Sequence, residues 1–285
     1  MIPAEFNYDV ADSVDHALSL LDSYGPDAKL LAGGHSLIPM MKLRFARPSA
    51  LVDIGRIAAL SYVEEDGDQI RIGAGTRHHD VHRSDVLEAG CPVLSFTAGL
   101  IGDPQVRHKG TIGGSVAHGD PASDLPAVLL ALGADFVLTG AGGQTRVVPA
   151  SDLFKGFFET AIGAGEILTE IRVPNLGASS GWSYLKFNRR AQDWAIVGVA
   201  AVVERSNGGI GTARVALTNM GATPLRATSV EEALAGAGRE AIPAAAAMAA
   251  EGTSPPSDTN AGADFRRHLA GVLVGRAVEE ALGGP

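Results

Sequence analysis

Apolar and polar positions along residues 1–176 form short blocks that predict alternating helices and strands. Between Ser13 and Tyr24, apolar residues recur at helical spacing, which predicts a helix capped by Ser13 or Asp12. Asp-Gly and Gly-Gly pairs between short alternating runs predict two β-hairpins. The predicted elements are a helix at 13–24, a strand at 29–32, a short helix at 37–43, a strand at 51–54, a hairpin of 61–63 with 69–72, helical sequence at 86–101, a helix at 125–132, a hairpin of 136–138 with 146–148, and a strand at 167–173.

The pattern changes after a Pro-, Gly- and Ser-containing segment at 174–181. Three apolar strands are predicted beyond it, followed by three helices, an order typical of an α+β unit. These elements are strands at 182–187, 195–203 and 213–217 and helices at 230–234, 241–250 and 264–282. The apolar stripe of the last helix is expected to contain Phe265, Leu269, Val272, Leu273, Arg276 and Ala277. We therefore expect one domain at 1–176, divisible near residue 56, and a second at 177–285.

Composition narrows the possible classes of protein. A chain of 285 residues with 46% hydrophobic residues can bury a full core. Its net charge of -9 disfavours a nucleic-acid partner. The basic clusters Arg189-Arg190 and Arg266-Arg267-His268 are short, so we expect them to lie on solvated faces. No apolar stretch approaches the roughly 20 residues that span a bilayer, so we expect no transmembrane segment.

The single cysteine, Cys91, predicts a small core residue, because one thiolate can form neither an internal disulfide nor a cluster site with about four ligands. The opening segment Met1 to Phe6 lacks the basic and apolar regions of a signal peptide, so a reducing cytoplasm is the expected location. His78, His79 and His82 have helical spacing, but no further ligand completes a metal site. We expect a polar helix face there and no bound metal.

Two glycine loops are the candidate binding elements. The stretch Lys29-Leu30-Leu31-Ala32-Gly33-Gly34-His35-Ser36 has the form of a strand, a glycine turn and a helix, and Thr111-Ile112-Gly113-Gly114-Ser115 predicts a second such turn. Glycine pairs permit positive φ and remove Cβ atoms, so backbone N–H groups can converge on an anion such as a pyrophosphate. Either loop alone is more often a plain tight turn, but two loops could hold one dinucleotide between them.

With the following Asp120-Pro121-Ala122-Ser123-Asp124-Leu125-Pro126, these loops resemble the FAD-binding medium subunit of molybdenum hydroxylases. That family contains aerobic carbon monoxide dehydrogenase and the flavin domain of xanthine dehydrogenase. The resemblance covers nearly the whole chain. It implies an α+β protein with a two-loop FAD-binding domain of the vanillyl-alcohol-oxidase/PCMH type, followed by a small C-terminal domain like that of the CO dehydrogenase flavoproteins.

The resemblance also implies the contacts of a non-covalent FAD. Residues Lys29 to Ser36 and Thr111 to Ser115 would hold the diphosphate and the neighbouring sugar groups, although many relatives have Asn where this chain has Ser115. Ile101 would lie against the ring system, and Asp124 and the backbone around Leu168 would complete the polar contacts. Lys186 would lie close to the flavin and favour its reduced, anionic form.

From the sequence alone, other roles remain open for three of these side chains. Asp124 is equally suited to capping the helix that follows it, and Lys186 to an exposed position on its strand. Trp194 would either screen the flavin ring or lie in the core.

Three functions are compatible with this site. The first is an electron-transfer flavoprotein with no catalytic residue of its own, in a heterohexamer with a large molybdenum-binding subunit and a small iron–sulfur subunit. Molybdopterin and [2Fe-2S] clusters would lie only in those partners, and electrons would pass to an external acceptor. Carbon monoxide is the first expected substrate of the complex and an aldehyde or N-heterocycle the next; peripheral attachment at the inner face of the membrane is left open.

The second possible function is a free-standing FAD-dependent oxidase, for which His35 is placed to tether the flavin. The third is a nucleotide-binding protein without catalysis. This one is disfavoured because both the P-loop and the G-x-G-x-x-G spacing are absent.

Overall fold

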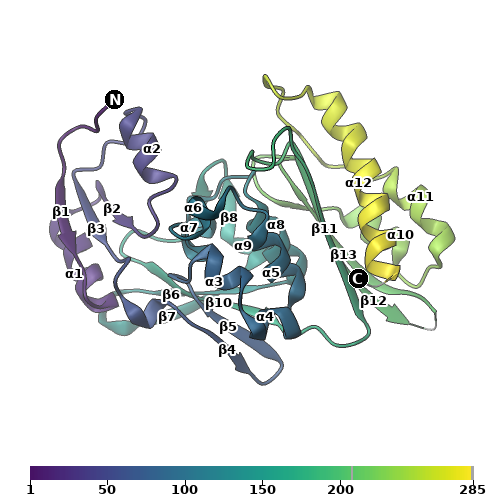
Figure 1. The fold of residues 1–285 in the computed structure, drawn as a ribbon, viewed down its shortest axis with the longest axis horizontal. Helices are drawn as coiled ribbons and strands as arrows, with labels where there is room; N and C mark the ends of the chain where they lie inside the picture. Colours follow the sequence, from purple (N-terminus) through teal and green to yellow (C-terminus); the bar gives the residue numbers. More distant parts are fainter. Residues whose placement is uncertain (207, 284–285) are drawn as a thin grey trace.

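Three β-sheets follow one another along the long axis of the molecule in the computed structural model, which describes residues 1–206 and 208–283 (Figure 1). The first sheet is parallel with the order β1-β3-β2. Helix α1 packs on it through Ala17 and Leu18, and the Ser13 side chain accepts a hydrogen bond from the His16 N–H at 3.2 Å, as the cap prediction requires. The elements are β1 (Asn7–Val10), α1 (Val14–Tyr24), β2 (Ala28–Leu31), α2 (Leu37–Lys42) and β3 (Ala50–Asp53).

The second sheet is antiparallel, with the order β4-β5-β10-β6-β7. Its strands are β4 (Val63–Asp66), β5 (Gln69–Gly73), β6 (Asp135–Thr139), β7 (Thr145–Pro149) and β10 (Ile167–Pro174), and a small hairpin is formed by β8 (Phe154–Gly156) and β9 (Glu159–Thr160). Its helices are α3 (His78–His82), α4 (Asp85–Gly90), α5 (Pro92–Gly99), α6 (Pro104–Arg107), α7 (Ile112–His118), α8 (Asp124–Leu132) and α9 (Ala150–Leu153). Cys91 is fully buried in this core, as predicted.

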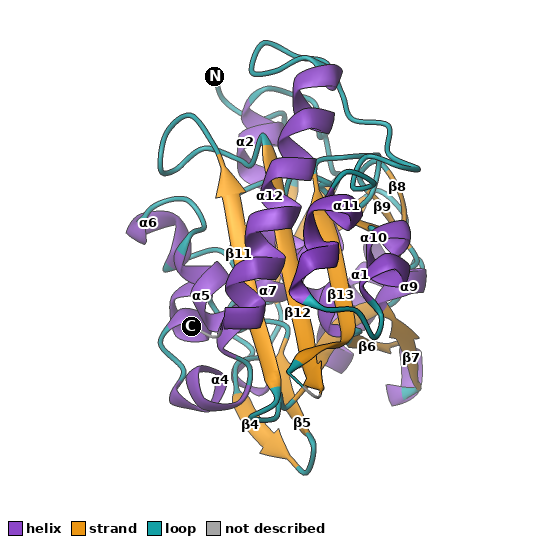
Figure 2. Ribbon diagram, turned by 90° about the vertical axis from the view of Figure 1, so that its right-hand side faces the viewer, coloured by secondary structure: helices purple, strands orange, loops and turns teal. Residues whose placement is uncertain are grey.

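The third sheet is antiparallel and has helices on both faces (Figures 1 and 2). Helices α10, α11 and α12 cover one face, and α5 and α8 of the preceding part pack against the other. Residues 197–203 of β12 are consequently all buried, which explains their uninterrupted apolar run. The elements are β11 (Ser180–Phe187), β12 (Val197–Ser206), β13 (Gly209–Thr218), β14 (Leu225–Arg226), α10 (Thr228–Leu234), α11 (Ile242–Ala246) and α12 (Ala263–Gly283).

The predicted helices and long strands are present, whereas β1, β14, the β8–β9 hairpin and the short helix α6 were not predicted. The predicted apolar face of α12 is partly wrong. Phe265, Val272 and Arg276 are exposed, while Ala270, Val274 and Arg266 are buried. The helix lies so close to the sheet, with the Ala281 carbonyl against Gly181, that small side chains suit the interface better than large ones.

Candidate functional site

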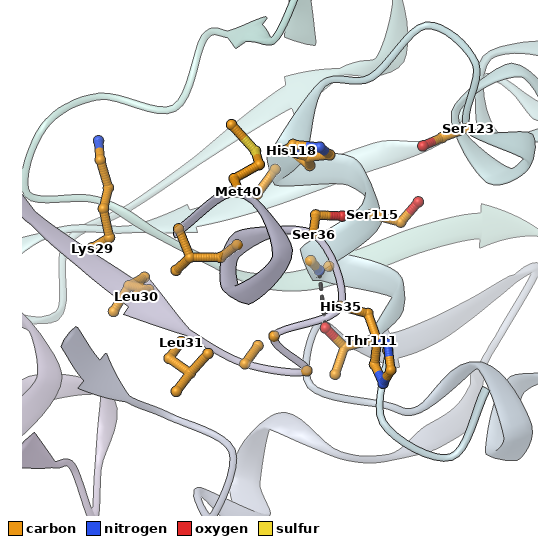
Figure 3. Close-up of a pocket in the computed structure, with 18 of the residues that line it drawn as sticks. Lys29, Leu30, Leu31, His35, Ser36, Met40, Thr111, Ser115, His118 and Ser123 are labelled. Carbon is orange, nitrogen blue, oxygen red and sulfur yellow. Dashed lines mark hydrogen bonds between the residues drawn. The ribbon is translucent and has the colours of Figure 1, made fainter. Parts of the chain in front are cut away.

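A cavity of about 850 Å³ lies where the three parts of the chain meet, each part being one of the three sheets with the helices packed on it. Its wall includes Lys29 from β2, Ser115 from α7, and Lys186 from the end of β11. In the view of Figure 3, Lys29 and Ser123 lie on opposite sides, with Ser36 and Ser115 close to each other between them. The two glycine loops therefore border one cavity, as the hypothesis of a shared dinucleotide site requires.

The first glycine loop presents unused backbone donors to this cavity. Gly34 has a φ of 75°, so the positive φ expected of a glycine turn is present there. Among the described residues, no hydrogen-bond acceptor is recorded for the N–H groups of residues 33–36. A Cβ atom on Gly33 would lie 2.7 Å from Gly110 Cα and 2.9 Å from the Lys109 carbonyl carbon, so only glycine permits this approach to the segment preceding the second loop. Unpaired N–H groups beside such a close approach form an anion-binding geometry.

The second glycine loop differs from the prediction, because it is the first turn of helix α7. Gly113 and Gly114 do not have positive φ. The Gly113 N–H donates to the Ala74 carbonyl at 2.9 Å, and the Gly114 N–H donates to the Thr111 hydroxyl at 3.0 Å (Figure 3). This loop is therefore not a second nest of free amides, and the groups it turns to the cavity include the Ser115 side chain. Gly113 is required because a Cβ there would collide with the backbone of Ala74.

A buried ion pair lies in the cavity wall between the second and third parts of the chain. Lys186 Nζ donates to Asp124 Oδ2 at 2.8 Å, and the Tyr184 hydroxyl donates to Asp124 Oδ1 at 2.6 Å. The Lys186 side chain is only 6% exposed, so the alternative of an exposed strand lysine is wrong. In the described part of the chain the Asp124 side chain makes no capping hydrogen bond to α8, and its two carboxylate oxygens accept from Lys186 and Tyr184 instead. Burial raises the pKa of Asp124, although Lys186 and the two hydrogen bonds act in the opposite direction.

Histidines add buried, weakly basic groups around the cavity. Burial lowers the pKa of His78 to about 4, and nearby His35, Arg107 and Arg77 act in the same direction. The His118 ring lies tilted against the Phe158 ring with centroids 4.8 Å apart, and burial lowers the pKa of His118 as well.

The three histidines considered for a metal site have separate environments. His78 is buried, the His79 ring stacks on that of His108, and His82 Nδ1 lies 3.1 Å from the Ser95 carbonyl. Within residues 1–206 and 208–283, no group of three or more His, Cys, Asp or Glu side chains is placed to hold a metal ion.

Sixteen of the predicted site residues line the cavity, and Ile112 does not. The lining residues are Lys29, Leu30, Leu31, Ala32, Gly33, Gly34, His35, Ser36, Ile101, Thr111, Gly113, Gly114, Ser115, Asp124, Leu168 and Lys186. Ile112 is fully buried in the core, and its N–H donates to the Thr76 carbonyl, so its role is to anchor α7. Trp194 also lines the cavity and is 57% exposed, which rules out the alternative of a core residue.

Sequence reasoning missed several other residues at the site. His78, His118, Phe45 and Phe158 line the cavity, and nothing in their local sequence indicated this position. Tyr184 is different, because it precedes Lys186 by two residues on β11 and therefore shares its face of the strand. Alternation along this strand was a signal that could have placed both side chains on Asp124.

Sequence comparison finds related proteins over nearly the full length of the chain. Residues 4–176 match the family described as the FAD binding domain in molybdopterin dehydrogenase, and residues 182–281 match the CO dehydrogenase flavoprotein C-terminal domain. The carbon monoxide dehydrogenase medium chain of Hydrogenophaga pseudoflava is 44% identical over 99% of this chain and 98% of its own length. The glyceraldehyde dehydrogenase medium chain of Sulfolobus acidocaldarius is 38% identical over 98% of this chain and 99% of its own.

Solved structures of two related enzymes have the same fold as this chain. A structure of carbon monoxide dehydrogenase from Hydrogenophaga pseudoflava superposes with a TM-score of 0.96 at 46% identity, over 99% of both chains. Quinoline 2-oxidoreductase from Pseudomonas putida 86 superposes with a TM-score of 0.93 at 29% identity, also over 99% of both chains. In the part of the chain that the structure describes, no helix has the length and apolar character needed to cross a membrane.

The chain contains both domains of this flavoprotein type, and its cofactor is FAD. Two features of the first glycine loop fit a dinucleotide. The N–H groups of residues 33–36 have no recorded acceptor among the described residues, and the lack of a Cβ at Gly33 lets the loop lie against the segment before α7. Both features allow backbone to contact a diphosphate. On this evidence the chain belongs to the FAD-binding medium subunits of the molybdenum hydroxylases, a family of oxidoreductases that includes the carbon monoxide dehydrogenase medium chains.

Proposed function

We propose that this chain carries electrons within a molybdenum hydroxylase complex, from [2Fe-2S] clusters of a small partner subunit through FAD to an external acceptor. A large partner subunit would bind the molybdenum cofactor and oxidise the substrate. The observation that carries the proposal is the cavity bordered by the free amides of residues 33–36, by α7 and by the Asp124–Lys186 pair. Bound FAD supplies one- and two-electron redox chemistry, and the protein supplies position and electrostatics.

The diphosphate is assigned to the first glycine loop rather than to both loops equally. Residues 33–36 offer N–H donors without internal acceptors, whereas the N–H groups of Ile112, Gly113 and Gly114 are already bonded. The side chains of Ser36 and Ser115 both line the cavity, and their hydroxyl groups would complete the polar contacts (Figure 3). Gly114 lies in the cavity wall, and a Cβ there would lie 2.7 Å from the Thr111 hydroxyl oxygen, which caps α7.

The isoalloxazine ring is assigned to the region of Ile101, Asp124, Lys186 and Trp194. Lys186 places a positive charge in the cavity wall that would stabilise extra negative charge on the reduced ring. Asp124 holds this ammonium group in place and partly offsets its charge, so the pair fixes the position of Lys186 as well as its field. The cofactor would then contact both regions of the chain, the FAD-binding region at 1–176, which includes Leu168, and the C-terminal region at 177–285.

Carbon monoxide is the proposed substrate of the complex. Two carbon monoxide dehydrogenase medium chains are each 44% identical over 99% of this chain, compared with 39% for subunit alpha of the 6-hydroxypseudooxynicotine dehydrogenase complex. Substrate would be chosen in the large subunit, so this assignment is tested on the complex. An aldehyde or an N-heterocycle is the alternative outcome of that test.

Purification from the native host tests the proposal. We expect two further subunits to copurify, with iron–sulfur absorption and releasable molybdopterin, and dye reduction driven by carbon monoxide. Acid precipitation should release FAD into the supernatant. A single-subunit protein whose flavin stays bound to the precipitate through His35 would instead support a free-standing oxidase, and a flavin-free protein without partners would refute both.

A further inference from the structure

The loop between β11 and β12, residues 188–196, forms part of the cavity wall; we call it the Trp194 loop. Gln192, Asp193 and Trp194 of this loop line the cavity. Because Trp194 lines the cavity and is also more than half exposed, it lies at the opening. The conformation of this loop therefore decides whether an aromatic ring stands at the opening of the proposed flavin site.

A buried arginine from α12 holds the C-terminal end of the Trp194 loop. Arg266 is 1% exposed, which contradicts the expectation of a solvated face for this cluster. Its Nη1 donates to the Ile196 carbonyl at 2.5 Å, and its Nη2 donates to Asp258 Oδ2 at 2.8 Å. Removing a cation from water is costly, and an apolar residue of similar volume would pack this face of α12 without that penalty. The arginine is thus better explained by its bonds to the loop than by packing.

Asn219, which follows β13, holds the same end of the loop. Its Nδ2 donates to the Ala195 carbonyl at 2.8 Å, and its own N–H donates to the Pro121 carbonyl at 2.8 Å. Asn219 has a φ of 62°, in the left-handed region that Asn adopts more readily than most residues with a side chain. Since Pro121 lies in the segment leading to Asp124, Asn219 links the Trp194 loop to the buried ion pair.

The remainder of the loop has bonds of its own, because Asn188 Nδ2 donates to the Arg190 carbonyl at 2.6 Å and the Asp193 N–H donates to the same carbonyl at 2.9 Å. Phe187, at the end of β11, meets Phe265 of α12 with ring centroids 6.2 Å apart, and Arg189 Nη1 donates to Asn260 Oδ1 at an exposed position. Within the described residues, Trp194 itself makes no recorded hydrogen bond or aromatic contact. Its side chain is therefore placed by the backbone of the loop, whose C-terminal end at Ala195 and Ile196 is buried and bonded to Asn219, Arg266 and the Phe187 carbonyl.

We propose that Arg266, braced by Asp258, is a positioning residue that acts through the Ile196 carbonyl to hold Trp194 at the opening of the cavity, with Asn219 as its counterpart. The role of Trp194 as a cover over the flavin rests on the proposed function. The placement of the loop does not, so the two are tested separately.

The test uses the two tryptophans of the chain, Trp182 and Trp194. In the full chain carrying Trp182→Phe, Trp194 is the only tryptophan, and acrylamide quenching of its emission reports how well the loop is held. We compare Arg266→Met, Arg266→Lys and Asn219→Gly, since glycine tolerates the left-handed backbone at 219. The matched control is Arg267→Met, because the neighbouring Arg267 is partly exposed and pairs only with Asp264.

Without added FAD, we expect the acrylamide quenching constant to change at least about twofold in Arg266→Met and Asn219→Gly, since a released loop samples other positions. Arg266→Lys should recover part of the change, and Arg267→Met should leave it unchanged. With FAD, quenching of Trp194 emission by the flavin should be strong in the parent and reduced in the first two variants.

An unchanged quenching constant in Asn219→Gly and in every folded Arg266 variant would overturn the inference and leave Arg266 as a structural contact of α12. If Arg266→Met does not fold, Asn219→Gly and Arg266→Lys decide the question. If the acrylamide result is as expected but FAD never affects Trp194 emission, the loop assignment stands and the flavin placement in the proposed function fails.

Discussion

Replacing Gly33 with alanine tests whether the first glycine loop must lie against residues 109–110, the segment that precedes the second loop. The new Cβ atom would lie 2.7 Å from Gly110 Cα and 2.9 Å from the Lys109 carbonyl carbon, whereas ordinary contacts begin near 3.4 Å. Both neighbours are backbone atoms, so the two segments must separate by at least about 0.7 Å. Overpacking of this kind costs about 1–3 kcal/mol.

This cost should appear mainly in FAD affinity. Without ligand the loops can relieve the clash by moving apart, but a shared dinucleotide requires them together. A loss of about 1–3 kcal/mol corresponds to roughly 5- to 150-fold weaker binding. We expect Gly33→Ala to lower the flavin-to-protein ratio of the complex purified from the native host, and to weaken FAD binding by the full chain in fluorescence titrations.

The matched control is Gly177→Ala, because a Cβ at Gly177 would meet only the Ser179 hydroxyl oxygen, at 4.0 Å, and Gly177 does not have positive φ. This variant should bind FAD as the parent does. A Gly33→Ala protein with parental flavin content and affinity would refute the reasoning that the first loop and the segment before α7 grip one ligand.

Three further predictions follow from the same site. Gly114→Val should yield a flavin-poor protein, because its side chain would displace the Thr111 hydroxyl that caps α7 and would enter the cavity; full flavin content would show that FAD does not lie against this turn of α7. Lys186→Met should retain FAD but slow its reduction in stopped-flow measurements on the complex, and should lower the free energy of unfolding by about 3–5 kcal/mol, because it leaves the Asp124 carboxylate buried without its cation. Adding Asp124→Asn should restore much of that stability, and a double variant no more stable than the single one would contradict the buried-pair argument. His78 has a folded pKa of about 4 against an ordinary 6.5, so the unfolded chain binds more protons between these values and stability should fall by up to about 3 kcal/mol as the pH drops through this range. Urea unfolding at several pH values should show a shallower loss in His78→Leu, and identical slopes would exclude His78 as the cause.

Local sequence was informative wherever one segment carried its own signal. Ser13 caps α1 as predicted, the Asp-Gly hairpin is present, and Cys91 is buried. The first glycine loop also has its expected turn, with positive φ at Gly34. Each of these outcomes depends on steric and hydrogen-bonding preferences within a few residues, which do not require the rest of the fold.

Outcomes that depend on distant partners were predicted less well. Thr111 to Ser115 looked like a second amide nest, but the Ala74 and Thr76 carbonyls occupy two of its N–H groups and make it a helix start. Arg266 looked like a surface residue, but it is buried and bonded to two partners. Ile196 is distant from it in the sequence, and Asp258 lies in the segment before α12. A hydrogen-bond partner brought in by tertiary packing leaves no mark on the sequence around the donor.

The sequence by itself determined most of the helices and the long strands, the presence of two glycine loops, and the likeness to the flavoprotein family. Only the tertiary structure decided that Gly33 lies against residues 109–110, that Asp124 pairs with Lys186, and that Arg266 reaches the end of the Trp194 loop. The reason is physical: backbone preferences act over a few neighbouring residues, whereas the cavity and its buried charges exist only after three sheets and their helices have packed together.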